Sequence, residues 1–329
     1  MADLDSHLLR YFLDARDQSI SGDHLAKELG VSRVAIWNRL ERLRGAGFVF
    51  SASTRKGYVL KSVPRELYPA LIEAHLQRLN FQPKLEFLTE VDSTNSEAER
   101  RLAAGQEAPF AVLARLQNAG RGRLGRKWHS RHPGNLYLSL AFRPLIAPDR
   151  LKPFTLWMGL ALCAHLDKNL GIRLGLKWPN DLLAPDGRKV AGMLTEARLD
   201  ADRVRECVFG LGLNVTAQRE DFPEELRQLA SSLAQVSSVN LEINQVAAGI
   251  LHALWAAWKD YEAGIWIKSF MPYWERYDVL TGKFVKIGLL GEPKEGVVRG
   301  INEEGSLILQ SPTGQTQVIS SGEVTLRKD

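Results

Sequence analysis

The chain has 329 residues and a formal net charge of +5 at pH 7, which predicts about two domains or slightly more and permits a nucleic-acid partner without requiring one. Its two cysteines, Cys163 and Cys207, lie in apolar surroundings, so neither a disulfide framework nor a metal cluster is expected, and a reducing cytoplasm fits. The acidic start Met1-Ala2-Asp3-Leu4-Asp5 and the lack of an apolar run of about 18 residues argue against export and against a membrane partner.

Residues 1–62 are predicted to form a separate winged helix-turn-helix domain. An apolar-periodic helix begins at His7, and Ser21 and Ser32 stand where the caps of a second and a third helix belong. The third helix carries one apolar stripe at positions i, i+4 and i+7, made of Ile36, Leu40 and Leu43. Two short strand-like runs, 48–50 and 57–60, then flank a basic tip that resembles a wing.

The exposed side of this domain is predicted to bind DNA. The third helix would enter the major groove, and the basic tip would contact phosphates. The side chains expected at the DNA are Ser32, Arg33, Trp37, Asn38, Arg55 and Lys56. The alternative is a three-helix packing module with Trp37 in its core, and the basic tip favours DNA binding over it.

Residues 63–278 are predicted to form a central domain in which helices alternate with pairs of strands. Helices are expected at 93–103, 153–170 and 241–261, and strands at 111–116, 135–140, 190–198 and 204–215. Asp200-Ala201-Asp202 separates the last two strands and predicts a hairpin. This order indicates an α+β fold with one mixed sheet and helices on one face of it.

Residues 279–329 are predicted to form a small C-terminal β domain. Short strand-like runs at 282–287, 295–300 and 306–309 are separated by turns that contain glycine. Strands this short and evenly spaced indicate a small barrel.

The segment Gly120-Arg121-Gly122-Arg123-Leu124-Gly125-Arg126-Lys127-Trp128 carries four cationic side chains and three glycines. Glycine lets backbone N–H groups approach a ligand closely, and arginine forks bind phosphate or carboxylate oxygens in pairs. The glycines also have the spacing of a dinucleotide-binding turn, but the pattern that follows predicts a loop and a strand instead of a helix. An anion-binding loop for a nucleotide phosphate is therefore favoured over that turn and over a solvated basic loop.

Four further segments contribute polar groups to the central domain. Asp92-Ser93-Thr94-Asn95 is expected to cap a helix and could also bind a polar ligand group. Lys177-Trp178-Pro179-Asn180-Asp181 places a lysine at a strand end, and Arg188-Lys189-Val190-Ala191-Gly192 begins a strand with a second lysine. Gly210-Leu211-Gly212-Leu213-Asn214 is the fourth segment. Each alone is a weak signal, because a lysine at a strand edge is usually solvated.

In this order and separation, the glycine–arginine loop and these segments resemble the biotin protein ligases, and with its N-terminal domain the chain looks like the bifunctional members that also repress a biotin operon. The resemblance covers nearly the whole chain. It implies a class II synthetase-like biotin/lipoate ligase fold for the centre and an SH3-like barrel for the C-terminal domain. Leu124 stands where the loop often has another arginine, and His129 where an aromatic residue is frequent. Both departures concern the affinity and ordering of the loop.

The resemblance implies a two-step reaction. Biotin carboxylate attacks the α-phosphate of Mg-ATP to give biotinyl-adenylate, and a lysine amine of an acceptor domain then attacks the mixed anhydride. The catalytic residues implied are Lys189, Arg121, Arg123 and Asp181, and Lys189 is expected to bridge carboxylate and phosphate because a compact ammonium can touch both. Asp181 could orient Lys189, contact the magnesium ion or accept the proton of the acceptor lysine, and the sequence leaves these roles open.

The resemblance also implies two adjoining binding sites. The biotin site would consist of Ser93, Thr94, Asn95, Gln117, Arg121, Gly122, Arg123 and Lys189. The ATP site would consist of Gly120, Arg121, Arg123, Trp128, Lys177, Asn180 and Asn214. The loop is expected to be mobile without ligand, because its like charges repel one another, and to become ordered when ligand binds.

The partners implied are a biotin carboxyl carrier protein, which is a subunit of acetyl-CoA carboxylase, operator DNA, and a second copy of the chain when biotinyl-adenylate is bound. Biotin would serve as substrate and as precursor of the co-repressor, and the location would be cytoplasmic. Two other functions stay open. A lipoate-protein ligase performs the same adenylation on a different acid and shares the fold, and a non-catalytic transcription factor could sense a small acid without consuming ATP.

Overall fold

The computed structural model describes residues 4–53, 57–200, 202–288 and 293–326. The chain divides into two compact units, residues 1–83 with 241–252 and residues 84–240 with 253–329. Helix α8 (Ile243–Glu262) belongs to the first unit up to His252 and to the second from Ala253. The domain boundaries expected at 62/63 and 278/279 stay predictions.

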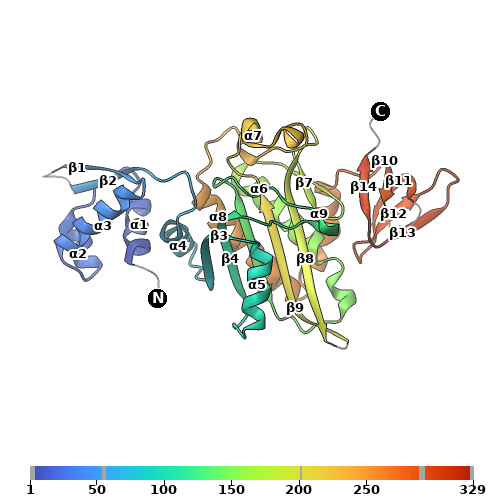
Figure 1. Cartoon of the computed structure of the whole chain (residues 1–329), viewed down its shortest axis with the longest axis horizontal. Coiled ribbons are helices and arrows are strands. Elements are labelled where there is room, and N and C mark those ends of the chain that lie inside the picture. Colours follow the sequence, from blue (N-terminus) through green and yellow to red (C-terminus); the bar gives the residue numbers. More distant parts are fainter. Residues whose placement is uncertain (1–3, 54–56, 201, 289–292, 327–329) are drawn as a thin grey trace. The chain divides into compact units, whose positions relative to one another are not determined.

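The first unit begins with the predicted winged helix-turn-helix. Its elements are α1 (Leu4–Ala15), α2 (Gly22–Glu28), α3 (Arg33–Gly45) and the antiparallel hairpin of β1 (Val49–Ser53) and β2 (Gly57–Ser62), drawn in blue in Figure 1. The predicted caps form, because the Ser21 and Ser32 hydroxyls each accept a bond of 3.1 Å, from the backbone N–H of His24 and of Ala35 respectively. Arg55 and Lys56 of the predicted basic tip lie outside the described residues.

The core of the first unit lies between α1, α3 and α4 (Pro69–Arg78). The predicted stripe of α3 is buried, whereas Trp37 on the opposite side is 52% exposed, which excludes the packing module with Trp37 in its core. Asp5, which is also buried, pairs with Arg39 and Arg42 and so fixes α1 to α3. The Gln77 amide donates to Ser6 Oγ over 2.9 Å and joins α4 to α1.

The second unit contains a seven-stranded sheet with the order β3-β4-β5-β9-β8-β7-β6. Its strands are β3 (Leu85–Val91), β4 (Phe110–Gln117), β5 (Leu136–Phe142), β6 (Gly175–Lys177), β7 (Asp181–Leu183), β8 (Lys189–Asp200) and β9 (Arg203–Leu213). The β3–β4 pair is parallel and the other pairs are antiparallel, so the predicted mixed sheet is confirmed. The pairing of β8 with β9 also confirms the predicted hairpin, of which Ala201 lies outside the described residues.

Helices cover both faces of this sheet, whereas the sequence predicted helices on one face. All seven residues of β5 are buried. Ala141 packs in a cluster with residues of α5 (Thr94–Ala103), and the neighbouring Phe142 stacks on Trp258 of α8 with ring centroids 4.0 Å apart. Since successive side chains of a strand point to opposite faces, both faces are packed against helices. Figure 1 shows α5 in front of the sheet, and α6 (Phe154–Leu170) packs against β6, β7 and β8.

The C-terminal part of the chain forms a five-stranded antiparallel sheet with the order β13-β12-β11-β10-β14. Its strands are β10 (Phe284–Gly288), β11 (Lys294–Ile301), β12 (Leu307–Gln310), β13 (Thr316–Ile319) and β14 (Glu323–Leu326). The predicted C-terminal β domain is therefore confirmed, with two strands that the sequence pattern did not show. In the sequence, α7 (Leu233–Val236), α8 and α9 (Ile267–Tyr277) lie between the strands of the first sheet and those of the second.

Both cysteines are free thiols inside the second unit. Burial raises the pKa of Cys207 to about 12, so this thiol stays protonated and unreactive at neutral pH. Among the described residues, no group of three or more His, Cys, Asp or Glu side chains could hold a metal ion. Of the helices described, none has the length and apolar character needed to cross a membrane.

Candidate functional site

The glycine–arginine loop, residues 120–128, forms a tight hairpin between β4 and β5. The backbone N–H of Gly122 donates to the carbonyl of Arg126 over 2.7 Å, and that of Trp128 donates to the carbonyl of Gly120 over 2.9 Å. At its tip Leu124 and Gly125 have φ values of 54° and 73°, in the left-handed region. The only helical segment between β4 and β5 is the short 3₁₀ turn Arg123–Gly125, which excludes a dinucleotide-binding turn that opens a helix.

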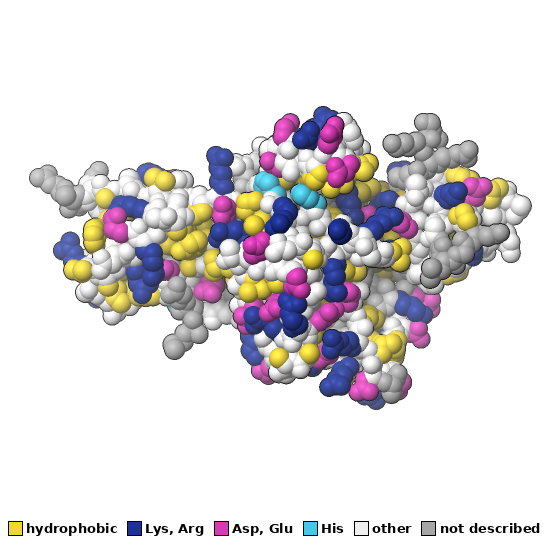
Figure 2. Space-filling model, viewed as in Figure 1, with side chains coloured by type: hydrophobic (Ala, Val, Ile, Leu, Met, Phe, Trp, Pro, Cys, Tyr) yellow, Lys and Arg dark blue, Asp and Glu magenta, His cyan; other side chains and the backbone are white. Residues whose placement is uncertain are grey.

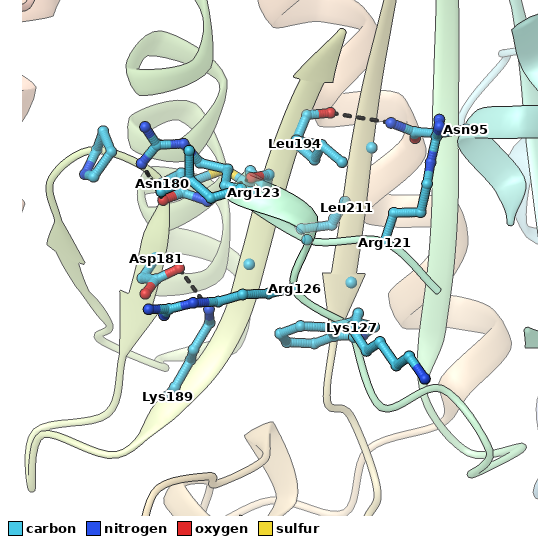
Figure 3. Close-up of a pocket in the computed structure, with 18 of the residues that line it drawn as sticks. Asn95, Arg121, Arg123, Arg126, Lys127, Asn180, Asp181, Lys189, Leu194 and Leu211 are labelled. Atoms are coloured by element: carbon cyan, nitrogen blue, oxygen red, sulfur yellow. Dashed lines mark hydrogen bonds and ion pairs between the residues drawn. The ribbon is translucent and has the colours of Figure 1, made fainter. Parts of the chain in front are cut away.

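A pocket brings this loop together with α5 and with strands β6 to β9 (Figure 3). Most of the predicted site residues line it: Ser93, Thr94, Asn95, Gln117, Arg121, Gly122, Arg123, Trp128, Lys177, Asn180, Asp181 and Lys189. Gly120 and Asn214 do not. The Asn214 amide is buried and engaged with Asn135 and with the Ser231 carbonyl, so its predicted contact with ATP stays a prediction.

At one end of the pocket, buried hydroxyl and amide groups bond to one another. Gln117 Oε1 accepts from the backbone N–H of Thr94 over 2.8 Å and from its hydroxyl over 3.1 Å. The hydroxyl of Ser139 lies 2.6 Å from Asn95 Oδ1 and 2.8 Å from Thr94 Oγ1. These neutral groups present donors and acceptors at fixed positions, as recognition of a polar, uncharged ring requires. We call Thr94, Asn95, Gln117 and Ser139 the neutral end.

Asp92 and Ser93 hold the start of α5, although not by the side-chain cap that the sequence predicted. Ser93 occupies the N-cap position, but its hydroxyl makes no capping bond. The Asp92 carboxylate instead accepts from the backbone N–H of Ser93 and binds Arg100 with two bonds of 2.8 Å. The bonds from Arg100 lower the pKa of Asp92 to about 2, so the carboxylate stays charged over the physiological range.

At the other end of the pocket, positive charges are partly buried. Lys189 Nζ lies 2.6 Å from Asp181 Oδ1, and Arg123 Nη1 donates to Asn180 Oδ1 over 3.4 Å and to the Gly322 carbonyl over 3.2 Å. Burial lowers the pKa of Lys177 and of Arg123, because removal from water disfavours the charged form. An anion that enters here replaces the lost hydration. We call Arg123, Lys177 and Lys189 the cationic end.

The side chain of Trp128, the last residue of the loop, packs against Gly212 of β9. A Cβ atom on Gly212 would overlap its indole ring, and one on Gly210 would overlap the Asn95 side chain, so glycine is needed at both positions for these close approaches. Lys189 Nζ lies 5.3 Å from the centroid of the Trp128 ring. The indole N–H of Trp128 is buried and has no partner among the described residues, and a bound nucleotide could accept its bond.

Sequence reasoning missed Ser139, the member of the neutral end that is fully buried in β5. A single serine in the apolar run Leu136-Tyr137-Leu138-Ser139-Leu140 was the available signal, because a buried strand admits a hydroxyl only where it finds a partner. The acidic neighbours of Arg121, which are Glu99 on α5 and Glu196 on β8, were also missed, because they are half-buried and stand in no local motif.

Comparison with known families accounts for all three parts of the chain. Residues 88–214 match the biotin/lipoate A/B protein ligase family, residues 5–59 match a helix-turn-helix domain, and residues 281–327 match the biotin protein ligase C-terminal domain. Two relatives match over almost their full length. The bifunctional ligase/repressor BirA of Bacillus spizizenii is 33% identical over 97% of this chain and 97% of its own, and that of Escherichia coli is 31% identical over 93% and 92%.

The chain belongs to the bifunctional ligase/repressor family. Among solved structures, the biotin protein ligase of Aquifex aeolicus in complex with biotin and ATP is 31% identical to it. That structure aligns with a TM-score of 0.62 over 75% of this chain and 99% of its own. The likeness in sequence and fold confirms the resemblance drawn from the motifs and the predicted class of central domain.

Proposed function

We propose that this member of the bifunctional ligase/repressor family is an ATP-dependent biotin protein ligase. The single observation that carries the proposal is the junction of the neutral end and the cationic end in one pocket. Biotin has an uncharged ureido ring at one end and a carboxylate at the other, so the two ends of the pocket match the two ends of the molecule. The cations then lie where that carboxylate meets the phosphates of ATP.

The first step joins two anions. An oxygen of the biotin carboxylate forms a bond to the α-phosphorus of ATP while the bond to pyrophosphate breaks. Lys189 and Arg123 offset the repulsion between the anions and stabilise charge on the phosphorus oxygens, which is the main contribution a protein makes to such a transfer. Trp128 covers the nucleotide, and Asn180 orients Arg123, with which it shares a bond.

The second step transfers biotin to an acceptor. A lysine amine of a biotin carboxyl carrier protein attacks the carbonyl of biotinyl-adenylate, an amide forms, and AMP leaves. Of the three roles left open for Asp181, we favour the orientation of Lys189, because its Oδ1 is already bonded to the Lys189 ammonium at 2.6 Å. A closed loop keeps water from the anhydride until the acceptor arrives.

Magnesium enters with ATP, and the residues of the pocket fit that mode of binding. Mg²⁺ usually binds through one or two carboxylates together with substrate phosphates. Among the described residues, the acids that line the pocket are Asp181 and Glu323, and no cluster there could hold the ion without ATP. The ion would neutralise phosphate charge, and either of these acids would hold it together with the phosphates.

Incubation of the protein with biotin and Mg-ATP tests the proposal. Biotinyl-adenylate should be found by mass spectrometry, and pyrophosphate should be released with biotin and much less with lipoate. Preferential release with lipoate would identify a lipoate ligase, and binding of biotin without consumption of ATP would identify a sensor. A second assay supplies the carrier domain and follows its mass increase.

We also propose that the first unit binds operator DNA as a homodimer in the cytoplasm. The exposed face of α3, with Arg33, Trp37 and Asn38, is free of core packing, and Arg33 pairs with the exposed Asp23 at 3.0 Å, a bond that DNA can replace. One helix-turn-helix covers one half-site, so tight binding requires a dimer on a two-fold symmetric operator. Operator affinity measured with and without biotin plus ATP tests the coupling, and equal affinities would contradict it.

A further inference from the structure

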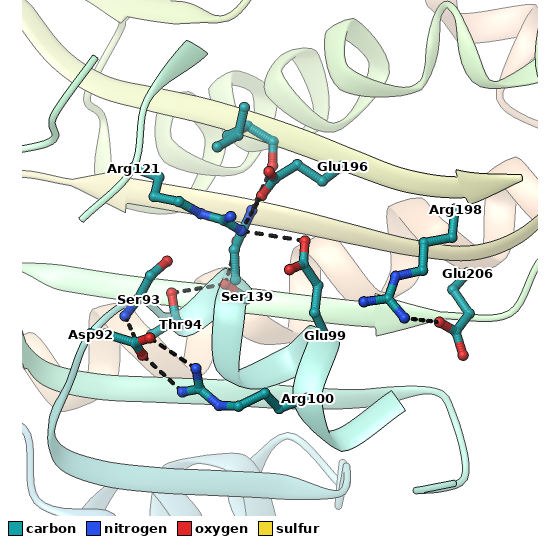
Figure 4. Close-up of polar contacts among 12 residues, drawn as sticks. Asp92, Ser93, Thr94, Glu99, Arg100, Arg121, Ser139, Glu196, Arg198 and Glu206 are labelled. Atoms are coloured by element: carbon teal, nitrogen blue, oxygen red, sulfur yellow. Dashed lines mark hydrogen bonds and ion pairs between the residues drawn. The ribbon is translucent and has the colours of Figure 1, made fainter. Parts of the chain in front are cut away.

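Arg121, the first arginine of the loop, is directed toward two glutamates (Figure 4). Its Nη2 lies 2.6 Å from Glu196 Oε2 on β8 and 3.3 Å from Glu99 Oε1 on α5. The three side chains are between 28% and 36% exposed, so the pairs are partly protected from solvent. Figure 2 shows that Lys/Arg and Asp/Glu side chains alternate over the face that carries α5, which is the setting of this contact.

The same Glu196 oxygen also binds the neutral end of the pocket. Asn95 Nδ2 donates to Glu196 Oε2 over 2.7 Å, while Asn95 Oδ1 accepts from the Ser139 hydroxyl. These opposed bonds fix which way the amide faces, because only its nitrogen can donate to a carboxylate. One carboxylate oxygen therefore connects the loop, through Arg121, to the amide of α5 at the neutral end.

Glu196 is not among the residues that line the main pocket, whereas Arg121 and Asn95 are, so it acts on the pocket through these two side chains. The contacts with Glu196 and Glu99 use only Nη2 of Arg121. Its Nε and Nη1 groups have no partner among the described residues and remain available to a ligand anion.

From this arrangement, and resting on the proposed function, we propose that Glu196 is a positioning residue for biotin binding. It holds Arg121 and Asn95 in place before biotin arrives, so that the guanidinium and the amide need little rearrangement to meet the ligand. Preorganised groups bind more tightly because the cost of ordering them is already met in the free protein. Glu99 supports Arg121 alone and over a longer distance, so its part is smaller.

The test compares Glu196→Ala and Glu196→Gln with Arg198→Ala as the matched control. Arg198 follows on the same face of β8, but it pairs with Glu206 at 3.8 Å and not with Arg121 or Asn95. Biotin affinity is measured by calorimetry without ATP. We expect Glu196→Ala to raise the Kd about tenfold, because two charge-assisted bonds are lost. Glu196→Gln should stay within about threefold of wild type, since its amide oxygen can accept both bonds. Arg198→Ala should match wild type.

Single-turnover adenylation at saturating biotin separates positioning from catalysis. We expect the rate for Glu196→Ala to fall by less than about threefold, because bound ligand then orders Arg121 and Asn95. An unchanged or lower Kd in Glu196→Ala would overturn the proposal, as would a large loss of rate with an unchanged Kd. Equal defects in the alanine and glutamine variants would also overturn it, because positioning through hydrogen bonds predicts rescue by glutamine.

Limited trypsin digestion of the ligand-free protein tests the same contact independently of biotin. Cleavage after Arg121, followed by mass spectrometry, should be faster in Glu196→Ala than in wild type and unchanged in Arg198→Ala. If the wild-type protein bound no biotin, the proposed ligase function would fail while this digestion would still report whether Glu196 holds Arg121. Equal cleavage rates in wild type and Glu196→Ala would contradict the positioning role.

Discussion

The neutral end and the cationic end of the pocket meet opposite requirements. In the neutral end, buried hydroxyl and amide groups bond to one another, so that they are held in place before a ligand enters. In the cationic end, three cations face the pocket beside Asp181 and Glu323. Burial of a cation without full compensation lowers the stability of the folded protein. A bound ligand anion restores that stability.

The two ends therefore differ in how a substitution should affect protein stability and catalysis. Substitution in the neutral end should weaken both the fold and biotin binding, because the network of bonds loses a partner. Substitution in the cationic end should weaken chemistry, and at Lys177, whose charge burial disfavours, it should also relieve the folded protein of an unfavourable charge. Four substitutions separate these outcomes.

The largest effect is expected for Lys189→Ala. It removes the ammonium that we propose lies between the two reacting anions, and loss of one such group costs roughly 100-fold or more in rate. Single-turnover formation of biotinyl-adenylate measures it. Lys152→Ala removes an exposed lysine that pairs with Asp149 and is the control. A rate equal to wild type would exclude Lys189 from the reaction, and the cationic end would then contribute no more to catalysis than the neutral end.

Arg123→Gly should release the intermediate. Arg123 bonds to Asn180 and to the Gly322 carbonyl, so its loss removes two anchors of the loop and one phosphate-directed fork. Free biotinyl-adenylate should then label bystander proteins about tenfold more than with wild type, on the scale of one charge-assisted bond. Leu124→Gly is the control, because its left-handed backbone already suits glycine and both arginines remain. Bystander labelling at the wild-type level would mean that the loop does not retain the adenylate.

Ser139→Ala should affect the neutral end alone. It leaves Asn95 and Thr94 with one bond fewer, and a lost buried hydrogen bond predicts a rise of roughly two- to tenfold in the KM for biotin. The maximal rate of adenylation should change little. Thr195→Ala deletes a hydroxyl of β8 that bonds Thr155 of α6, and it should leave the KM unchanged. A fall in rate without a change in KM would show that the network serves the chemistry.

The smallest effect is expected for Lys177→Met. Because burial lowers the pKa of Lys177 in the folded state, its charge destabilises the fold at neutral pH, and the penalty disappears as pH rises through the ordinary lysine pKa of about 10.4. The variant should therefore melt slightly above wild type at pH 7, and the difference should shrink toward pH 10. The exposed Lys168→Met is the control. A lower melting temperature at pH 7 would contradict the idea of an uncompensated charge.

Local signals explain what the sequence predicted well. The serine caps and the apolar stripe of α3 depend on neighbours within one helix, and β4, β5, β8 and β9 each follow a strand pattern, so all were found. Helices on both sides of the sheet could not be predicted, because packing of α6 and α8 against β5 depends on segments far apart in the chain. The way in which the start of α5 is held was not predicted for the same kind of reason: the bond of Asp92 to Arg100 joins residues eight positions apart.

The site residues divide in the same way. The glycine–arginine loop and Lys189 stand in dense local motifs, and the structure brings them to one pocket. Ser139, Glu99 and Glu196 act only through partners on other elements; the serine in an apolar run is the one local signal among them, and no local pattern marks the two glutamates. The predicted roles of all these residues in the reaction stay predictions until the variants are measured.

Gly210 and Gly212 have a consequence for the order in which substrates are added. They lie two positions apart on β9, one against Asn95 and the other against Trp128. A methyl group added at one of these positions would therefore disturb the contact of one substrate and leave the contact of the other intact. Gly210→Ala should obstruct the proposed biotin site and Gly212→Ala the proposed nucleotide site. If one substrate must bind first, the variant that obstructs it should lose binding of both substrates, whereas the other variant should lose only the second.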